Sequence, residues 1–246
     1  MISLDSPLRH LPQNLNRRQL LYLDGVRIAI EMCDIAYTRL SDTLLAITAT
    51  ENLPKAERAP MLISAVQDAW SAIDSVHRLR RLLKSLPRLK QKLPWLQGFY
   101  RATESIDDLR NVVQHLDSEM ETMIDANAPL WGRLTWIRVV DAETSTLESC
   151  SLVLGSFFDR MDRITNPTDR PIRSLIDQVD LHSSGHTACL TEAWRSLPNL
   201  VERIEKGLRA APQNLDGGSD ALMIVGMRIE SGPGQDLGEQ NGGSPG

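Results

Sequence analysis

The chain has 246 residues, of which 41% are hydrophobic, 24% are charged and 4% are aromatic. A chain of this length and composition can bury a core, which excludes a wholly disordered protein. The formal net charge of -5 excludes a protein that coats nucleic acid over its whole surface, although a local basic groove remains compatible with it.

The three cysteines, Cys33, Cys150 and Cys189, are odd in number and widely spaced. Such spacing is typical neither of a disulfide framework nor of a zinc site. The first residues lack the basic-then-apolar layout of a signal peptide, and no apolar run approaches the roughly 18 residues that cross a bilayer. We therefore expect a soluble cytoplasmic protein that does not engage a membrane.

Residues 1–18 contain Pro7 and Pro12 and predict an irregular lead-in. After them, apolar residues recur at alternating steps of three and four, which is the pattern of an amphipathic helix packed along its length. Pro54 predicts the end of this helix. Its apolar stripe is Leu23, Val26, Ile30, Cys33, Tyr37, Leu40, Leu44 and Ile47.

Two further long helices are predicted, one from near Pro60 and one between Pro94 and Pro129. Three such helices with short connections favour an up-down bundle over residues 19–128, and hence a mainly α fold. The stripe of the second helix is Ile63, Val66, Trp70, Ile73, Val76 and Leu83. The stripe of the third is Phe99, Ala102, Ile106, Leu109, Val113, Leu116, Met120 and Met123.

The remaining chain differs in composition from the predicted bundle. Residues 134–140 and 147–154 are rich in apolar and β-branched residues and flank a polar stretch, which predicts a β-hairpin. One or two helices are expected between residues 172 and 208, interrupted around 183–185. Residues 131–209 would then form a hairpin and C-terminal helices packed on the bundle. The Gly- and Ser-rich residues 210–246 predict a disordered tail.

The segment from 78 to 92 is strongly basic and contains no acidic residue. A solvated helix end followed by a basic loop is one interpretation of this run. Contact with RNA phosphates is the other interpretation, and four residues of the run are its candidates. Those candidates for RNA binding are Arg78, Arg80, Arg81 and Lys84.

His182, His186 and Cys189 are spaced by four and three residues, which in a continuous helix would place metal-ligand types on one face. Gly185 between them indicates a loop or a helix start, and no fourth ligand follows nearby. We therefore expect neither a metal site here nor any cofactor.

Arg110, Asn111 and His115 lie in the middle of the third predicted helix. Asn111 and His115 are four residues apart and share a face, and the long side chain of Arg110 can reach the same space. A histidine can accept or donate a proton near neutral pH, and an arginine can grip phosphate oxygens. These groups suit metal-independent RNA cleavage, in which the ribose 2′-hydroxyl attacks the phosphate and leaves a 2′,3′-cyclic phosphate.

This motif resembles the signature of the HEPN superfamily, in which an arginine is followed by a polar residue, three other residues and a histidine on a late helix of a bundle. The resemblance covers about residues 20–127 and implies that Arg110 and His115 are catalytic, with Asn111 in support. It also implies a homodimer whose two motifs form one composite site. Members of the superfamily act as toxins, phage-defence effectors or RNA-processing enzymes, so the resemblance also implies an antitoxin or a regulatory protein as a partner. Many members carry an aromatic residue two positions after the histidine, where this chain has Asp117.

Three other interpretations compete with a nuclease. In the first, Arg110 merely pairs with Asp107 on the helix surface and His115 is a satisfied, partly buried residue. In the second, the chain is a non-catalytic helical module for oligomerisation or for protein or RNA binding. In the third, paired carboxylates such as Glu31 and Asp34 hold magnesium in a nucleotide pyrophosphohydrolase, although the doubled glutamate motif of such enzymes is absent.

Overall fold

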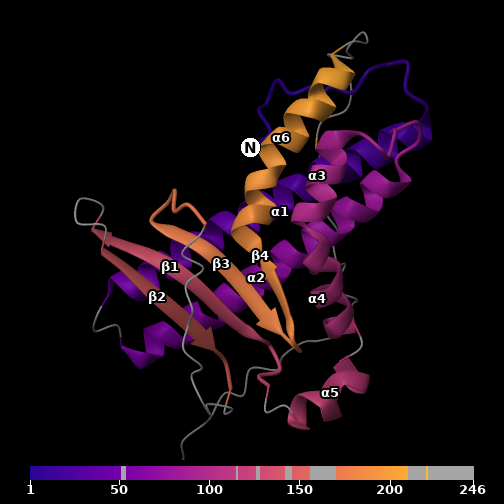
Figure 1. Cartoon of the computed structure of the whole chain (residues 1–246). Helices are drawn as coiled ribbons and strands as arrows, with labels where there is room; N and C mark the ends of the chain where they lie inside the picture. The colour runs from indigo at the N-terminus through magenta and orange to yellow at the C-terminus, as the bar shows by residue number, and fades with distance from the viewer. Residues whose placement is uncertain are drawn as a thin grey trace, which may run out of the picture.

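A computed structural model describes residues 1–50, 54–114, 116–125, 128–141, 146–155, 170–209 and 220. Within these ranges more than half of the residues are helical, and the chain forms six helices and a four-stranded antiparallel sheet (Figure 1). The mainly α prediction holds at this level. The predicted tail, 210–246, lies outside the described residues apart from Asp220. No helix in the described ranges is long and apolar enough to span a membrane.

Two long antiparallel helices form the centre of the molecule, α1 (Arg17–Ala49) and α2 (Lys55–Ser85). Asn16 caps α1 by accepting from the amide of Gln19, whose side chain in turn accepts from the amide of Asn16. The buried stripe of α1 follows the predicted residues closely. In α2 the predicted Val66, Ile73, Val76 and Leu83 are buried together with several alanines, whereas the predicted core residue Ile63 is 59% exposed.

The predicted third long helix is instead three shorter ones, so a bundle of three or more long helices is not confirmed. The first break falls at Thr103, which has a non-helical ψ of 14° and is fully buried. Its hydroxyl donates to the carbonyl of Phe99 and accepts from the guanidinium of Arg80. The buried Arg80–Thr103 contact thus coincides with the end of the first short helix. The three are α3 (Pro94–Ala102), α4 (Glu104–Gln114) and α5 (Leu116–Asp125).

The predicted hairpin is confirmed, whereas part of the predicted C-terminal helical region is a second hairpin. Ser184 and Gly185 both have positive φ, 46° and 77°, which is the geometry of a tight two-residue hairpin turn. The expected interruption of a helix is therefore this turn between two strands. The strands pair in the order β2-β1-β3-β4. They are β1 (Arg133–Asp141), β2 (Thr146–Val153), β3 (Ile176–Ser183) and β4 (His186–Cys189).

The last described helix, α6 (Leu190–Leu208), confirms the C-terminal helical prediction and joins the sheet to the other helices. It packs against α3, β3 and α1, with the sheet lying on one side of the α1–α2 pair (Figure 1). Leu8 of the lead-in is fully buried and belongs to the same core as Ile30 of α1. One continuous core therefore connects the lead-in, the helices and the sheet.

Candidate functional site

Charged side chains join α2 to α4 along an antiparallel seam. Arg110 of α4 donates from Nε to Asp74 of α2 at 2.9 Å. One turn earlier in α4, Asp107 contacts His77, which lies one turn later in α2, at 2.8 Å. We call this set the α2–α4 seam. Its members are Asp74, His77, Arg78, Arg80, Lys84, Asp107 and Arg110.

At the first step of the seam, Asp74 holds two arginines. Besides Arg110, it accepts from Nε of Arg78 at 2.6 Å. Burial acts to raise the pKa of Asp74, but the Arg110 hydrogen bond and the charge of Arg78 together bring it below its ordinary value. In the amide orientation that places its oxygen next to Arg110, Gln114 also accepts from both terminal nitrogens of that residue, at 2.9 and 3.1 Å. Arg110 is thus oriented while its side chain keeps 23% exposure.

At the second step, Asp107 holds three basic side chains. The terminal nitrogen of Arg80 lies 2.9 Å from one carboxylate oxygen, Nζ of Lys84 lies 3.6 Å from the same oxygen, and His77 uses the other. Burial acts to raise the pKa of Asp107, but the hydrogen bond and charge of Arg80, with His77 and Lys84, lower it below its usual range. A carboxylate held in this way stays ionised and fixes the imidazole ring.

The four residues predicted to bind RNA lie in different environments. Arg80 is only 4% exposed and is bonded to Asp107, the carbonyl of Tyr100 and the hydroxyl of Thr103. Its guanidinium is a structural cation of the interior and does not face RNA. Arg78 is exposed but paired with Asp74, and Lys84 is exposed but paired with Asp107. Arg81 is exposed on the same helix.

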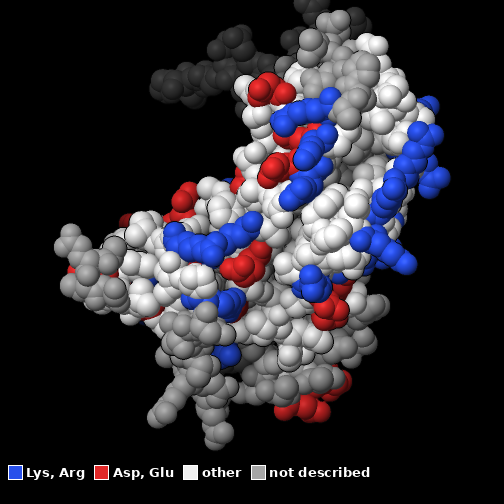
Figure 2. Space-filling view, turned by 45° about the horizontal axis from the view of Figure 1, so that its top comes forward, with Lys and Arg blue, Asp and Glu red and all other residues white. Residues whose placement is uncertain are grey.

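Exposed basic residues continue past the end of α2. Among the described residues, Arg81, Arg88, Lys90 and Lys92 have no acidic partner, and Lys84 also lies over the ring of Tyr100. Figure 2 shows Lys and Arg gathered along the side of the molecule where α2 ends. We call this surface the basic end. Its members are Arg81, Lys84, Arg88, Lys90 and Lys92.

The motif predicted to be catalytic is placed only in part. Arg110 pairs with Asp74 of the neighbouring helix and not with Asp107 of its own, so the first of the rival interpretations gave it the wrong partner. Asn111 is exposed on α4, next to Arg110. His115 lies outside the described residues. On the core side, Leu109 and Val112 are buried and fix α4 against the rest of the protein.

The residues weighed as metal ligands are engaged elsewhere. His182 lies in β3, not in a helix, and its two ring nitrogens lie 2.8 Å from the hydroxyls of Thr135 and Thr187. Burial lowers the pKa of His182, which favours the neutral ring. Cys189 faces Arg170. Across the part of the chain that the structure describes, no three His, Cys, Asp or Glu side chains are grouped to hold a metal ion.

The carboxylates of the pyrophosphohydrolase interpretation are also occupied by cations and donors. Glu31 pairs with Arg9 and Arg27, while Asp34 accepts from the indole nitrogen of Trp194 and from the terminal amino group. These contacts tie the lead-in and α6 to α1. They give both carboxylates a structural role.

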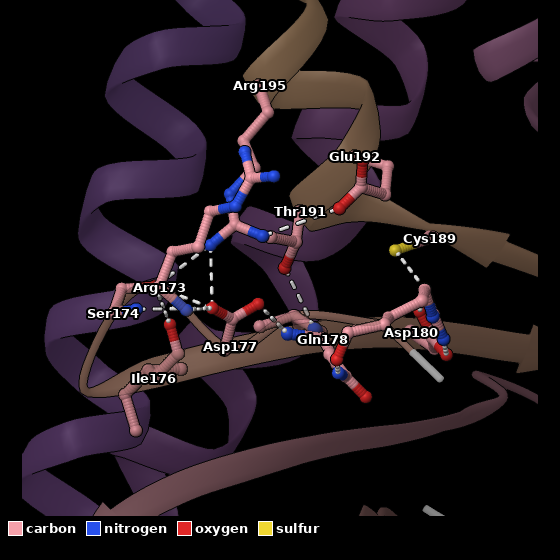
Figure 3. Close-up of polar contacts among 12 residues, drawn as sticks. Arg173, Ser174, Ile176, Asp177, Gln178, Asp180, Cys189, Thr191, Glu192 and Arg195 are labelled. Carbon is pink, nitrogen blue, oxygen red and sulfur yellow. Dashed lines mark hydrogen bonds and ion pairs between the residues drawn. The ribbon is translucent and has the colours of Figure 1, made fainter. Parts of the chain in front are cut away.

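A second polar cluster, which sequence reasoning missed, surrounds Asp177 at the start of β3 (Figure 3). Asp177 is fully buried and accepts from Arg195 of α6 at 2.6 Å and from the amides of Arg173, Ser174 and Gln178. Both oxygens of this carboxylate accept hydrogen bonds from the protein, so neither is available to a substrate. The contacts stabilise the turn that precedes β3. The sequence carries little signal for this cluster, because Asp177 is followed by Gln178 and its burial is seen only in the folded structure.

Nearby side chains complete this scaffold. The hydroxyl of Thr191 accepts a hydrogen bond from the backbone amide of Val179 and lies 2.8 Å from the hydroxyl of Tyr37. Arg170 pairs with Asp180 at 2.8 Å, and burial raises the pKa of the adjacent Cys189 thiol to about 12, which leaves it protonated and unreactive. The cluster joins β3, β4, α6 and α1. It holds the sheet and does not present a reactive group.

The α2–α4 seam is therefore the candidate site, because it combines partly exposed cations with an oriented histidine. No protein-family model matches the chain, and neither a curated protein nor a solved structure shows significant similarity to it.

Proposed function

We propose that the chain is a metal-independent endoribonuclease of HEPN type that acts in the cytoplasm. The observation that carries this proposal is the placement of Arg110, whose guanidinium is oriented by Asp74 and still reaches solvent. Helices α1, α2 and α4 would be the HEPN-like core. Arg110 and His115 would be the catalytic residues, and Asn111 would support them.

Arg110 has the chemistry to bind a scissile phosphate. Its Nε donates to Asp74, while among the described residues its terminal nitrogens contact only the neutral amide of Gln114. A phosphate is a stronger acceptor than an amide, and bidentate arginine–phosphate pairs are among the stronger hydrogen-bonded contacts. RNA would therefore displace Gln114 and leave the Asp74 contact in place. The bound guanidinium would stabilise charge as the 2′-oxygen attacks phosphorus.

The basic end supports RNA as the substrate class. Arg81 lies one turn beyond Arg78 on α2, Lys84 follows after another turn, and Arg88 lies just past the end of the helix. This row leads along α2 away from the contact between Asp74 and Arg110. The basic end would bind the backbone of a strand whose scissile phosphate lies at Arg110.

A homodimer is part of the proposal, since HEPN-like motifs act in pairs. An apolar stripe on the outward face of α1 favours self-association: Leu21, Ile28, Met32 and Ile35 are between 45% and 71% exposed. Their spacing of seven, four and three places them along one side of the helix. The same stripe favours the second candidate, a non-catalytic oligomerisation module. A toxin or phage-defence role, with an antitoxin or regulator, would follow from nuclease activity.

The test is cleavage of mixed-sequence RNA oligonucleotides in EDTA by the wild type and by Arg110→Gln. We expect cleavage by the wild type and a loss of about 10²–10³-fold in Arg110→Gln, because a donor to the developing charge is removed. His115→Ala should show a loss of similar size.

The matched control for Arg110→Gln is Arg101→Gln, an exposed arginine at the end of α3 that should leave cleavage unchanged. An oligomerisation module would leave RNA intact with every variant. Equal cleavage by the wild type and by folded Arg110→Gln would refute the role of Arg110.

A further inference from the structure

We propose that His77 is a second proton-transfer residue of this site and acts as the general acid that protonates the departing 5′-oxygen. The inference rests on the proposed ribonuclease function and adds a residue outside its motif. Cleavage of RNA by 2′-hydroxyl attack needs two proton transfers, one from the 2′-oxygen and one to the 5′-oxygen. The proposed catalytic motif supplies one histidine per chain.

His77 and Arg110 occupy successive steps of the α2–α4 seam. Arg110 contacts Asp74, which lies one turn before His77 in α2. His77 contacts Asp107, which lies one turn before Arg110 in α4. A three-residue step along a helix advances about 4.5 Å, so the imidazole and the guanidinium lie within reach of one phosphodiester.

Asp107 orients the ring for proton donation. The contact of 2.8 Å joins its carboxylate to Nδ1 of His77, which leaves Nε2 as the second functional nitrogen. No described residue hydrogen-bonds to Nε2, and the side chain keeps 18% exposure. Arg80 holds the other oxygen of Asp107 from the interior. The ring is therefore fixed by one nitrogen and available through the other.

The charges around His77 favour an anionic ligand. Arg78, Arg80 and Lys84 on α2 and Arg110 on α4 face only the two carboxylates of Asp74 and Asp107 within the seam. A surplus of positive charge remains when both carboxylates are ionised. One phosphodiester would reduce this surplus and would place its leaving oxygen beside the imidazole.

The reaction step balances without any added reagent. The 2′-oxygen loses its proton to the base and forms a bond to phosphorus, while the bond from phosphorus to the 5′-oxygen breaks. His77, in its protonated form, transfers the proton on Nε2 to that oxygen. The products are a 2′,3′-cyclic phosphate and a 5′-hydroxyl. The base ends protonated and His77 ends neutral.

The test compares two substrates with His77→Gln. The first is an RNA oligonucleotide that the wild type cleaves, and the second is the same strand with sulfur in place of the 5′-bridging oxygen at the cleaved linkage. A thiolate leaves without a proton, so a variant that lacks only the general acid should cleave it normally. We expect His77→Gln to lose about 10²-fold in kcat on the oxygen substrate and less than about twofold on the sulfur substrate.

Variants separate the possible failures. His186→Gln, an exposed histidine of β4, should match the wild type on both substrates. Arg110→Gln should lose activity on both substrates, because the arginine that binds the phosphate is removed. If the wild type cleaves no RNA, the proposed function itself fails. If the wild type cleaves RNA and His77→Gln cleaves at the same rate, His77 is not the general acid. The same conclusion follows if His77→Gln loses the same activity on both substrates. In either case the nuclease assignment stands.

Discussion

Replacing Asp177 with alanine is expected to lower the free energy of unfolding by about 3–5 kcal/mol. The substitution leaves the guanidinium of Arg195, whose side chain is 16% exposed, without its main partner. It also leaves the amides of Arg173 and Gln178 without the carboxylate that accepts their hydrogen bonds. Removing one member of a buried ion pair is costly because the remaining charge stays desolvated. Urea denaturation followed by circular dichroism would measure the change.

The control for this prediction is Glu192→Ala. Glu192 contacts the same Arg195 at 3.3 Å but is 47% exposed, so its loss should change stability by less than about 1 kcal/mol. Similar small effects for Asp177→Ala and Glu192→Ala would contradict the structural role of Asp177.

The Asp177 cluster should also make stability depend on pH. Burial acts to raise the pKa of Asp177, but Arg195 and the amides of Arg173 and Gln178 lower it below its ordinary value. A carboxyl with a lowered folded-state pKa stabilises the protein above the unfolded-state pKa of about 3.9, and this contribution is lost as the pH falls through the folded-state pKa. Asp177→Asn should therefore lose less stability than the wild type on acidification from pH 6.

Replacing Arg80 with methionine is expected to cost about 2–4 kcal/mol of folding free energy. Methionine fills much of the space of the arginine stem but leaves the carbonyl of Tyr100 and the hydroxyl of Thr103 without their buried donor. It also removes the cation that contributes most to lowering the pKa of Asp107. The pKa of Asp107 should rise in the variant, which NMR titration of its side-chain carboxyl would detect.

Arg78→Met is the matched comparison, because Arg78 lies two residues earlier on the same helix. Its side chain is 63% exposed, so its pair with Asp74 should contribute less than about 1 kcal/mol. Comparable losses in both variants would show that Arg80 is not the interior cation that the seam requires.

The elements that could be predicted from the sequence are those whose apolar residues recur at a regular local spacing. The stripe from Leu23 to Leu44 and the hairpin near Leu134 were found because their apolar residues follow a local pattern typical of a helix or of paired strands. The prediction of a third long helix was wrong because the apolar stripe continues across Thr103, where the helix breaks. The break is stabilised by the contact of Thr103 with Arg80, which is distant in the sequence. The strands within residues 176–189 were not predicted, because β3 is buried on both faces and buried residues do not alternate with exposed ones along it.

The candidate site could be predicted only in part, because ion pairs between helices depend on their register. The motif identified Arg110, but nothing in the sequence shows that Asp74, 36 residues earlier, is its partner. The same is true of His77 and Asp107, which are 30 residues apart. The basic run was visible as composition, yet burial of Arg80 beside the exposed Arg81 follows from which face of α2 is turned toward α3 and α4.

The nuclease proposal depends on attack by a ribose 2′-hydroxyl without a metal ion. The most direct measurement is cleavage in EDTA of one RNA sequence and of its fully 2′-O-methylated counterpart, with the new ends identified by mass spectrometry. We predict that the RNA yields 2′,3′-cyclic phosphate ends and that the methylated strand stays intact. Cleavage of the methylated strand, or cleavage only when magnesium is added, would contradict the proposal.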